Sequence, residues 1–190
     1  MIAIIGKIAV GKTTFLRELE KTGSKIFISD EFVNSIYKKG QDGYKLIKDK
    51  LGKCFVDEYC VNKKVLVNWL NKDKANFNLL EKIIYPLIEK ELIDTKYDFV
   101  ELPNLNSEVY PLWKNFSHIV CLNTSYENWT KNIAKRNVDN HFISLISSKN
   151  NPESIKNKLF GLIPIVDIYA NNFKLNANNI KKILYALGIR

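Results

Sequence analysis

Short apolar runs alternate along this chain with longer segments in which apolar residues recur at helical spacing. Residues 2–5 read Ile-Ala-Ile-Ile, a continuous apolar run of the kind found in a strand that is covered on both faces. Further on, Phe15, Leu16 and Leu19 follow the spacing of one helix face, and Gly23 is a stop signal for that helix. The pattern therefore predicts a strand, then a loop containing glycine, then a helix.

Short, mostly apolar segments predict four further strands, and a last helix is expected as well. The strands lie at 25–28, 97–100, 118–122 and 165–169, and the last helix lies at 178–188. Helical stretches separate the strands, and this alternation is typical of a parallel sheet with helices on both faces. We therefore expect an α/β fold with a parallel sheet of about five strands. The stretch around 147–158, rich in Asn, Ser and Lys, is the best candidate for a mobile loop.

Length and composition limit the number of domains that the chain can form. With 190 residues, of which 46% are hydrophobic, it can bury one good core but hardly two, so we expect a single domain over 1–190. No window approaches the roughly 20 apolar residues that a membrane span needs, and the first residues are strand-like rather than a signal peptide. A cytoplasmic protein without a membrane partner is therefore expected.

Cysteine and histidine offer little chemistry in this sequence. Cys54, Cys60 and Cys121 are odd in number and lack C-x-x-C spacing, so neither a disulfide framework nor a zinc site is expected. Buried free thiols are the default expectation. His118 and His141 are the only histidines, and they do not suffice for a metal cluster.

The formal net charge of +9 raises the question of nucleic-acid binding, because a basic surface attracts phosphate. The composition argues against it, since lysine supplies nearly all of the basic residues and is spread along the chain. Dispersed lysines form a solvated face more often than a groove that follows a nucleic-acid backbone. No nucleic-acid partner is expected, and a small polyanionic substrate accounts for the same charge.

The loop after the first strand carries the most specific motif. Gly6-Lys7-Ile8-Ala9-Val10-Gly11-Lys12-Thr13 fits the phosphate-cradling pattern GxxxxGK[ST]. The two glycines let successive backbone N–H groups point inward at a phosphate, and the helix that starts near Lys12 adds its positive end. Lys12 is expected to reach the β- and γ-phosphates, and the Thr13 hydroxyl to ligate Mg²⁺. The loop, continued to Thr14, is therefore the predicted nucleotide-binding site.

A phosphate loop does not by itself choose a reaction, so the acceptor side has to be found separately. Asp30 follows the second predicted strand at its carboxyl end, where the ligands of open parallel sheets bind. There it can take a proton from an acceptor hydroxyl or help to hold the metal. It can equally cap a helix beginning at Glu31, and position alone does not decide. Glu101, at the end of the third strand, is either a Mg²⁺ ligand through water or a plain strand-end carboxylate.

The order of these features resembles the dephospho-CoA kinase family over nearly the whole chain. In that family an aspartate at the end of the second strand precedes a hydrophobic helix that ends near a glycine, as Asp30 to Gly40 does here. Tyr85-Pro86-Leu87-Ile88 is similar to the family's His-Pro-Leu-Ile, and Pro103-Asn104-Leu105 is similar to its Pro-Leu-Leu motif. Asn171-Asn172 resembles the family's asparagine after the last strand.

The resemblance implies a P-loop NTPase fold and an enzyme that uses Mg·ATP to phosphorylate the 3′-hydroxyl of dephospho-CoA, giving coenzyme A. It implies that Asp30 is the general base, that Lys12 handles phosphates, and that Arg136 clamps the transferring phosphate with its planar fork of donors. The partner is then the small-molecule substrate, bound by a monomer or weak homo-oligomer.

Further roles follow from the same resemblance. Pro103, Asn104 and Leu105 line the acceptor pocket, and Asn172 joins the loop residues in binding ATP. A helical acceptor-binding region is implied at about 31–92 and a lid at about 137–160.

Departures from the family pattern leave two alternatives open. Tyr85 stands where the family has histidine, and Trp129 and Asn132 stand where glutamine and arginine are usual. The lid region offers lysines, which are point charges rather than bidentate forks. A nucleoside or nucleotide kinase of the same fold is one alternative, and a non-catalytic nucleotide-binding regulator is the other. The sequence lacks an Asn-Lys-x-Asp guanine signature, and Tyr85-Pro86-Leu87-Ile88 favours dephospho-CoA.

Overall fold

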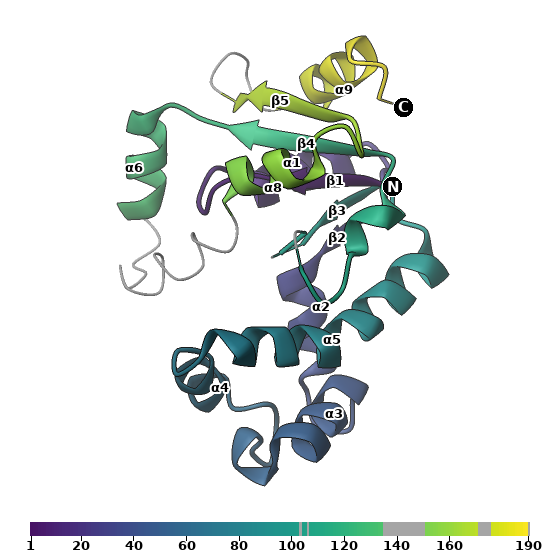
Figure 1. Cartoon of the computed structure of the whole chain (residues 1–190). Coiled ribbons are helices and arrows are strands. Elements are labelled where there is room, and N and C mark those ends of the chain that lie inside the picture. Colours follow the sequence, from purple (N-terminus) through teal and green to yellow (C-terminus); the bar gives the residue numbers. More distant parts are fainter. Residues whose placement is uncertain (103, 106, 135–150, 171–175, 190) are drawn as a thin grey trace. The chain divides into compact units, whose positions relative to one another are not determined.

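The structure is a computed structural model, and within it the chain forms two compact units (Figure 1). It describes residues 1–102, 104–105, 107–134, 151–170 and 176–189. The first unit comprises 1–28, 96–106 and 113–190 and contains the sheet, whereas the second comprises 29–95 and 107–112 and is helical. The helical region expected at about 31–92 therefore lies in the second unit, and its role in binding an acceptor stays a prediction.

Parallel strands form the sheet of the first unit, in the order β2-β3-β1-β4-β5 (Figure 1). Ile2 of β1 lies opposite Phe99 of β3 on one side and His118 of β4 on the other. The α/β class with a five-stranded parallel sheet is thereby confirmed. The strands are β1 (Ile2–Ile5), β2 (Ile26–Ile28), β3 (Phe99–Glu101), β4 (His118–Asn123) and β5 (Ile165–Tyr169).

Helices cover both faces of this sheet. On one face α1 (Lys12–Glu20) and α9 (Ala177–Ala186) pack together over the main core. On the opposite face lies α8 (Pro152–Leu159), whose Lys156 reaches Asp167 of β5. The main core is built from alternate strand residues and the apolar stripes of the two helices: Ile2, Ile4, Phe15, Leu16, Leu19, Ile28, Phe99, Val120, Leu122, Ile168, Ile180 and Leu184.

Residues 152–158 correct the expectation of a mobile loop around 147–158, because they belong to α8. The Asn151 side chain caps this helix by accepting from the Glu153 N–H at 3.0 Å, and Pro152 stands in its first turn. Ile155 and Leu159, four residues apart, are both buried. The polar composition of the stretch made this buried pair hard to recognise in the sequence. Residues 147–150 lie outside the described part of the chain.

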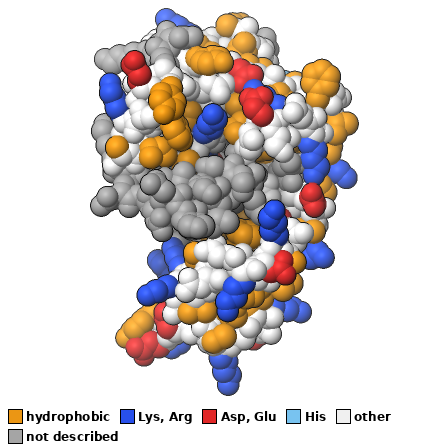
Figure 2. Space-filling view, turned by 60° about the vertical axis from the view of Figure 1, so that its left-hand side comes forward, with side chains coloured by type: hydrophobic (Ala, Val, Ile, Leu, Met, Phe, Trp, Pro, Cys, Tyr) orange, Lys and Arg blue, Asp and Glu red, His pale blue; other side chains and the backbone are white. Residues whose placement is uncertain are grey.

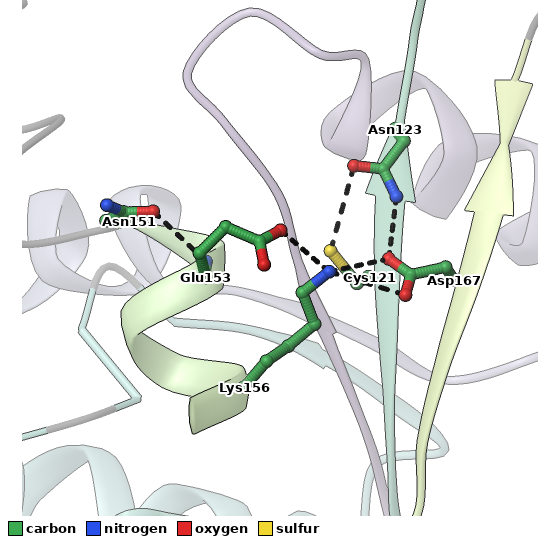
Figure 3. A network of polar contacts seen from close by, with 6 residues as sticks. All are labelled: Cys121, Asn123, Asn151, Glu153, Lys156 and Asp167. Atoms are coloured by element: carbon green, nitrogen blue, oxygen red, sulfur yellow. Dashed lines mark hydrogen bonds and ion pairs between the residues drawn. The ribbon is translucent and has the colours of Figure 1, made fainter. Parts of the chain in front are cut away.

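A polar network joins α8 to the sheet (Figure 3). Lys156 Nζ lies 2.7 Å from Glu153 Oε1 and 3.2 Å from Asp167 Oδ1, and the Asn123 amide donates to the same Asp167 oxygen at 2.7 Å. Burial raises the pKa of Asp167, but the hydrogen bonds from Asn123 and Lys156 outweigh it and leave the pKa below its ordinary value. The carboxylate therefore stays charged and holds Lys156 in place at neutral pH.

Cys121 lies beside this network and differs from the other cysteines. It is buried, whereas Cys60 is partly exposed and Cys54 is exposed, so the expectation of buried thiols holds for Cys121 alone. Burial first, and then the neighbouring Asp167 carboxylate, raises the pKa of the Cys121 thiol to about 12. The thiol of Cys121 is therefore neutral across the physiological range.

The second unit is built around the long helix α5 (Lys74–Thr95), with α2 (Ser29–Ile36), α3 (Asp42–Leu51) and α4 (Lys63–Leu70). Both α3 and α4 pack against α5, and α2 packs against α3. Inside the unit the Ser107 hydroxyl donates to the buried Glu81 carboxylate at 2.7 Å. No helix in the described part of the chain is long and apolar enough to cross a membrane.

Modification of thiols tests the packing of the first unit. Because the thiolate is the nucleophile, Ellman's reagent at pH 8 should modify Cys54 quickly and Cys121 only as fast as the protein unfolds. The slow phase should disappear in Cys121→Ser and persist in Cys54→Ser. A single rate for all thiols in the native protein contradicts the buried, neutral state of Cys121.

Candidate functional site

The glycine loop between β1 and α1 adopts a backbone that ordinary residues rarely allow. Gly6 has φ +151°, Ala9 has φ +61° and Gly11 has φ +105°. A Cβ on Gly6 would lie 2.5 Å from the Leu122 carbonyl oxygen of β4, so glycine is required there by space as well as by conformation. At Gly11 a Cβ would meet no atom within 4 Å, so only its φ favours glycine. The start of the loop therefore lies in close contact with the backbone of the neighbouring strand β4.

The end of this loop is the positive end of α1. Gly11 stands at the N-cap, and the first bond inside the helix runs from the Phe15 N–H to the Gly11 carbonyl at 2.9 Å. The amides of a first helical turn have no acceptor within their own helix, and the helix dipole adds positive potential there. Residues 12–14 therefore present backbone donors suited to an anion, which is the fit expected for nucleotide phosphates.

Lys12 places its ammonium group against the carbonyls of the same loop. Its Nζ donates to the Gly6 oxygen at 3.0 Å and to the Lys7 oxygen at 3.3 Å, and lies 3.6 Å from Glu101 Oε1 at the end of β3. Only 16% of the Lys12 side chain and 17% of the Glu101 side chain are exposed. This pair carries a cation and an anion at the edge of the sheet where the loop begins.

The other loop residues divide into two groups. Ala9 and Val10 are buried, and Val10 belongs to the main core, so only their backbone can face a ligand. The Lys7 and Thr14 side chains are exposed, and Thr13 is half-buried. The structure thus brings the predicted loop residues together around a set of backbone amides, with Lys12 and Thr13 supplying side-chain chemistry.

Helix α6 (Tyr126–Ala134) supplies two contacts to this loop that the sequence did not predict. The Trp129 indole Nε1–H donates to the Ile8 oxygen at 2.9 Å, and the Asn132 side-chain amide donates to the Ala9 oxygen at 3.0 Å. The sequence showed both residues only as departures from the family pattern. Their spacing of three residues indicated a shared helix face, but nothing local identified a partner more than 120 positions away.

Asp30 lies in the first turn of α2, which begins at Ser29 and not at Glu31 as expected. The Asp30 side chain is exposed, while Ser29 is buried. The strand before it ends at Ile28, opposite Glu101, and therefore at the same edge of the sheet as the loop after β1. Asp30 itself belongs to the second unit, so its role toward the loop stays a prediction.

The residues expected at the acceptor pocket differ in accessibility. Leu105 is buried, with 1% of its surface exposed, and Asn104 is half-buried. Tyr85, at the position of the family's histidine, is also buried and packs edge-on against Tyr110 within the second unit. The expected roles of Leu105 and Asn104 stay predictions, and three other candidates lie outside the described residues: Pro103, Arg136 and Asn172.

The basic charge is unevenly divided between the two units. The second unit has equal numbers of basic and acidic residues, so the whole net charge of +9 belongs to the first unit, which carries the loop. On the face drawn in Figure 2 the lysine and arginine side chains are scattered among uncharged and apolar ones. Charge dispersed in this way favours small anions over a long nucleic-acid backbone.

Metal binding by side chains alone finds no support in the described ranges. There, no three His, Cys, Asp or Glu side chains gather closely enough to hold a metal ion. Mg²⁺ does not need such a cage, because it commonly binds through nucleotide phosphates, water and one or two protein oxygens. Among the described residues, Thr13 of the loop and Glu101 at the end of β3 carry side-chain oxygens of this kind.

Comparison with known proteins agrees with this geometry. A family model described as dephospho-CoA kinase matches residues 1–140. A dephospho-CoA kinase of Mycoplasma genitalium is 37% identical over 89 residues, 46% of this chain and 45% of that protein. One of Mycoplasma pneumoniae is 31% identical over 100 residues, 52% of this chain and 50% of that protein. The chain thus spans about half the length of the curated relatives it matches.

A solved structure extends the comparison to the whole fold. A dephospho-CoA kinase from Campylobacter jejuni aligns with a TM-score of 0.57 and 17% identity, and the alignment covers 98% of this chain and 96% of that one. At this identity the likeness establishes the fold alone, and it does so across both the sheet and the helical segments.

Alanine substitutions at the two glycines test the loop geometry. Gly11→Ala should cost about 1–2 kcal/mol of unfolding free energy, because its φ disfavours a Cβ. Gly6→Ala should cost about 1–3 kcal/mol more, because the Cβ also collides with the β4 backbone. Urea unfolding of the two variants measures the difference, and equal losses contradict the close approach of Gly6 to Leu122.

Proposed function

This chain belongs to the dephospho-CoA kinase family, and we propose that it transfers the γ-phosphoryl group of ATP to the 3′-hydroxyl of dephospho-CoA. The observation that carries the proposal is the loop itself: backbone amides at a helix N-terminus with Lys12 held beside them. A site built in this way positions and neutralises a polyphosphate, which is most of what phosphoryl transfer asks of a protein.

On the donor side, the amides of the loop and of the first turn of α1 bind the β- and γ-phosphate oxygens. Lys12 is close enough to contact these phosphates, since its Nζ donates to the Gly6 and Lys7 carbonyls of the loop. Mg²⁺, when bound with the nucleotide, neutralises charge on the phosphates, and the Thr13 hydroxyl is its ligand from the chain. Glu101, whose Oε1 lies 3.6 Å from Lys12 Nζ, would hold a water of that ion.

On the acceptor side, Asp30 is the general base. As the 3′-oxygen attacks the γ-phosphorus, the new O–P bond forms, the bond to the β–γ bridging oxygen breaks, and ADP leaves. The proton of the 3′-hydroxyl passes to the Asp30 carboxylate, which is exposed in the first turn of α2 and therefore accessible to a ligand. Asn104 remains a candidate acceptor contact on its accessibility.

Three residues outside the described part of the chain keep the roles that the family implies. Arg136 clamps the transferring phosphate, Pro103 lines the acceptor pocket and Asn172 contacts ATP. For Arg136 the chemical reason is clear, because a guanidinium binds two phosphate oxygens at once and lysine does not.

The proposed activity predicts ADP release that depends on dephospho-CoA. The assay uses the protein with Mg·ATP and a panel of dephospho-CoA, nucleosides and nucleoside monophosphates. Asp30→Asn should lower kcat by about 10²-fold or more, the usual contribution of a general base. Lys12→Ala should cause a loss of about 10²-fold or more, because it removes a cation from the transferring phosphate.

Matched variants control for general damage to the chain. Asp42→Asn removes an exposed carboxylate from the first turn of another helix, α3, and Lys45→Ala removes its exposed lysine partner. Both should retain near wild-type turnover. Turnover with a nucleoside but none with dephospho-CoA would overturn the acceptor assignment. Binding of ATP without turnover on any acceptor favours the regulator instead.

A further inference from the structure

We propose that Trp129 and Asn132 are positioning residues that hold the phosphate loop in its anion-binding conformation. The proposal rests on the nucleotide-binding function above and concerns α6, which the phosphate-loop motif does not include. Both side chains come from one face of that helix and donate to consecutive loop carbonyls, those of Ile8 and Ala9. The two bonds, 2.9 and 3.0 Å long, are partly shielded from water.

Holding these carbonyls fixes the direction of the amides next to them. In a planar trans peptide the C=O of one residue and the N–H of the next point in opposite directions. The bond from Trp129 to Ile8 therefore turns the Ala9 N–H away from α6, and the bond from Asn132 to Ala9 does the same for the Val10 N–H. That second amide closes the tight turn of the loop by donating to the Lys7 oxygen at 3.2 Å.

The conformation that is held is a costly one. Ala9 takes a left-handed φ of +61°, which a side chain disfavours. Asn132 binds the carbonyl of this same residue. The bond from Asn132 thus offsets the backbone strain at Ala9, where the loop takes a positive φ without a glycine.

The loop carbonyls fall into two groups with different donors. Those of Gly6 and Lys7 accept from the Lys12 ammonium, whereas those of Ile8 and Ala9 accept from α6. A polyphosphate attracts the charged Lys12 ammonium and competes with the Gly6 and Lys7 carbonyls for its N–H donors. An indole and a carboxamide carry no charge, so a polyphosphate attracts them less strongly. The bonds from Trp129 and Asn132 can therefore persist when phosphate is bound, and they hold the loop conformation while Lys12 contacts the phosphate.

Variants that lose one donor each test this inference. Trp129→Phe keeps an aromatic ring at this position, where the indole centroid lies 6.0 Å from that of Tyr126, and removes the N–H, and Asn132→Ala removes the amide. Each should weaken ATP binding by about 3- to 10-fold in calorimetric titration, the loss expected for one net hydrogen bond. The KM for ATP should rise in proportion, while the KM for dephospho-CoA stays unchanged. Asn132→Gln, which keeps an amide on α6, should recover part of the affinity.

Two control variants lie in the same unit. Asn128→Ala removes an exposed asparagine from α6, and Trp113→Phe removes an indole from the 3₁₀ turn Leu112–Asn115. Both should bind ATP within about 2-fold of wild type. All titrations are made well below the unfolding temperature, with the folded fraction of each variant checked by circular dichroism, so that a general loss of stability does not imitate a loss of affinity.

A spectroscopic readout separates loop positioning from general stability. In ¹⁵N-labelled protein the indole N–H signal of Trp129 is the one that Trp129→Phe removes. It should exchange with solvent at least about tenfold more slowly than free tryptophan, and it should shift on addition of ATP or inorganic tripolyphosphate. The Trp69 signal, from the second unit, should not shift with tripolyphosphate.

The outcomes distinguish this inference from the proposed activity. Unchanged ATP affinity in both Trp129→Phe and Asn132→Ala overturns the inference while leaving the kinase activity intact, and so does a rapidly exchanging Trp129 indole. A wild-type protein that binds ATP without phosphorylating dephospho-CoA overturns the activity. In that case the affinities of the two variants still decide whether α6 positions the loop.

Discussion

The planarity of the peptide bond is the constraint on which this site depends. A loop that turns its amides toward a phosphate must turn the carbonyls of the same peptides elsewhere, and those carbonyls then need donors of their own. Here the donors come from Lys12, from the Val10 amide and from two side chains of α6. The site is therefore formed by the loop together with α6, the helix that follows β4. The eight-residue motif describes the loop and not the donors from α6.

The sequence predicted those parts of the fold whose signal is local. Residues 2–5 and 165–169 were placed at the bounds of β1 and β5, because short, mostly apolar segments between helices have few other interpretations in a parallel sheet. The glycine requirement at Gly6 also follows from the motif. The helix at 152–159 was missed because Asn, Ser and Lys dominate its composition, and a single buried pair four residues apart is a weak pattern.

The parts of the site that could not be predicted depend on partners far away in the chain. Trp129 and Asn132 meet carbonyls at the other end of the sequence, and only the pairing of β1 with β4 makes that approach possible. The pairing of Lys12 with Glu101 likewise depends on β3 lying next to β1. The family resemblance gave Trp129 and Asn132 only as departures from its usual pattern, and it assigned no role to Glu101.

The division of charge between the units has a consequence for the kinetics of ligand capture. The unit with the phosphate loop carries the whole net positive charge, and the helical unit is electrically balanced. Long-range attraction accelerates the arrival of an oppositely charged ligand, and dissolved salt shortens its reach to about 8 Å at physiological ionic strength. Encounter with a polyanion at the first unit is therefore a steered process that slows as salt rises, while encounter at the second unit is governed by ordinary diffusion and local contacts.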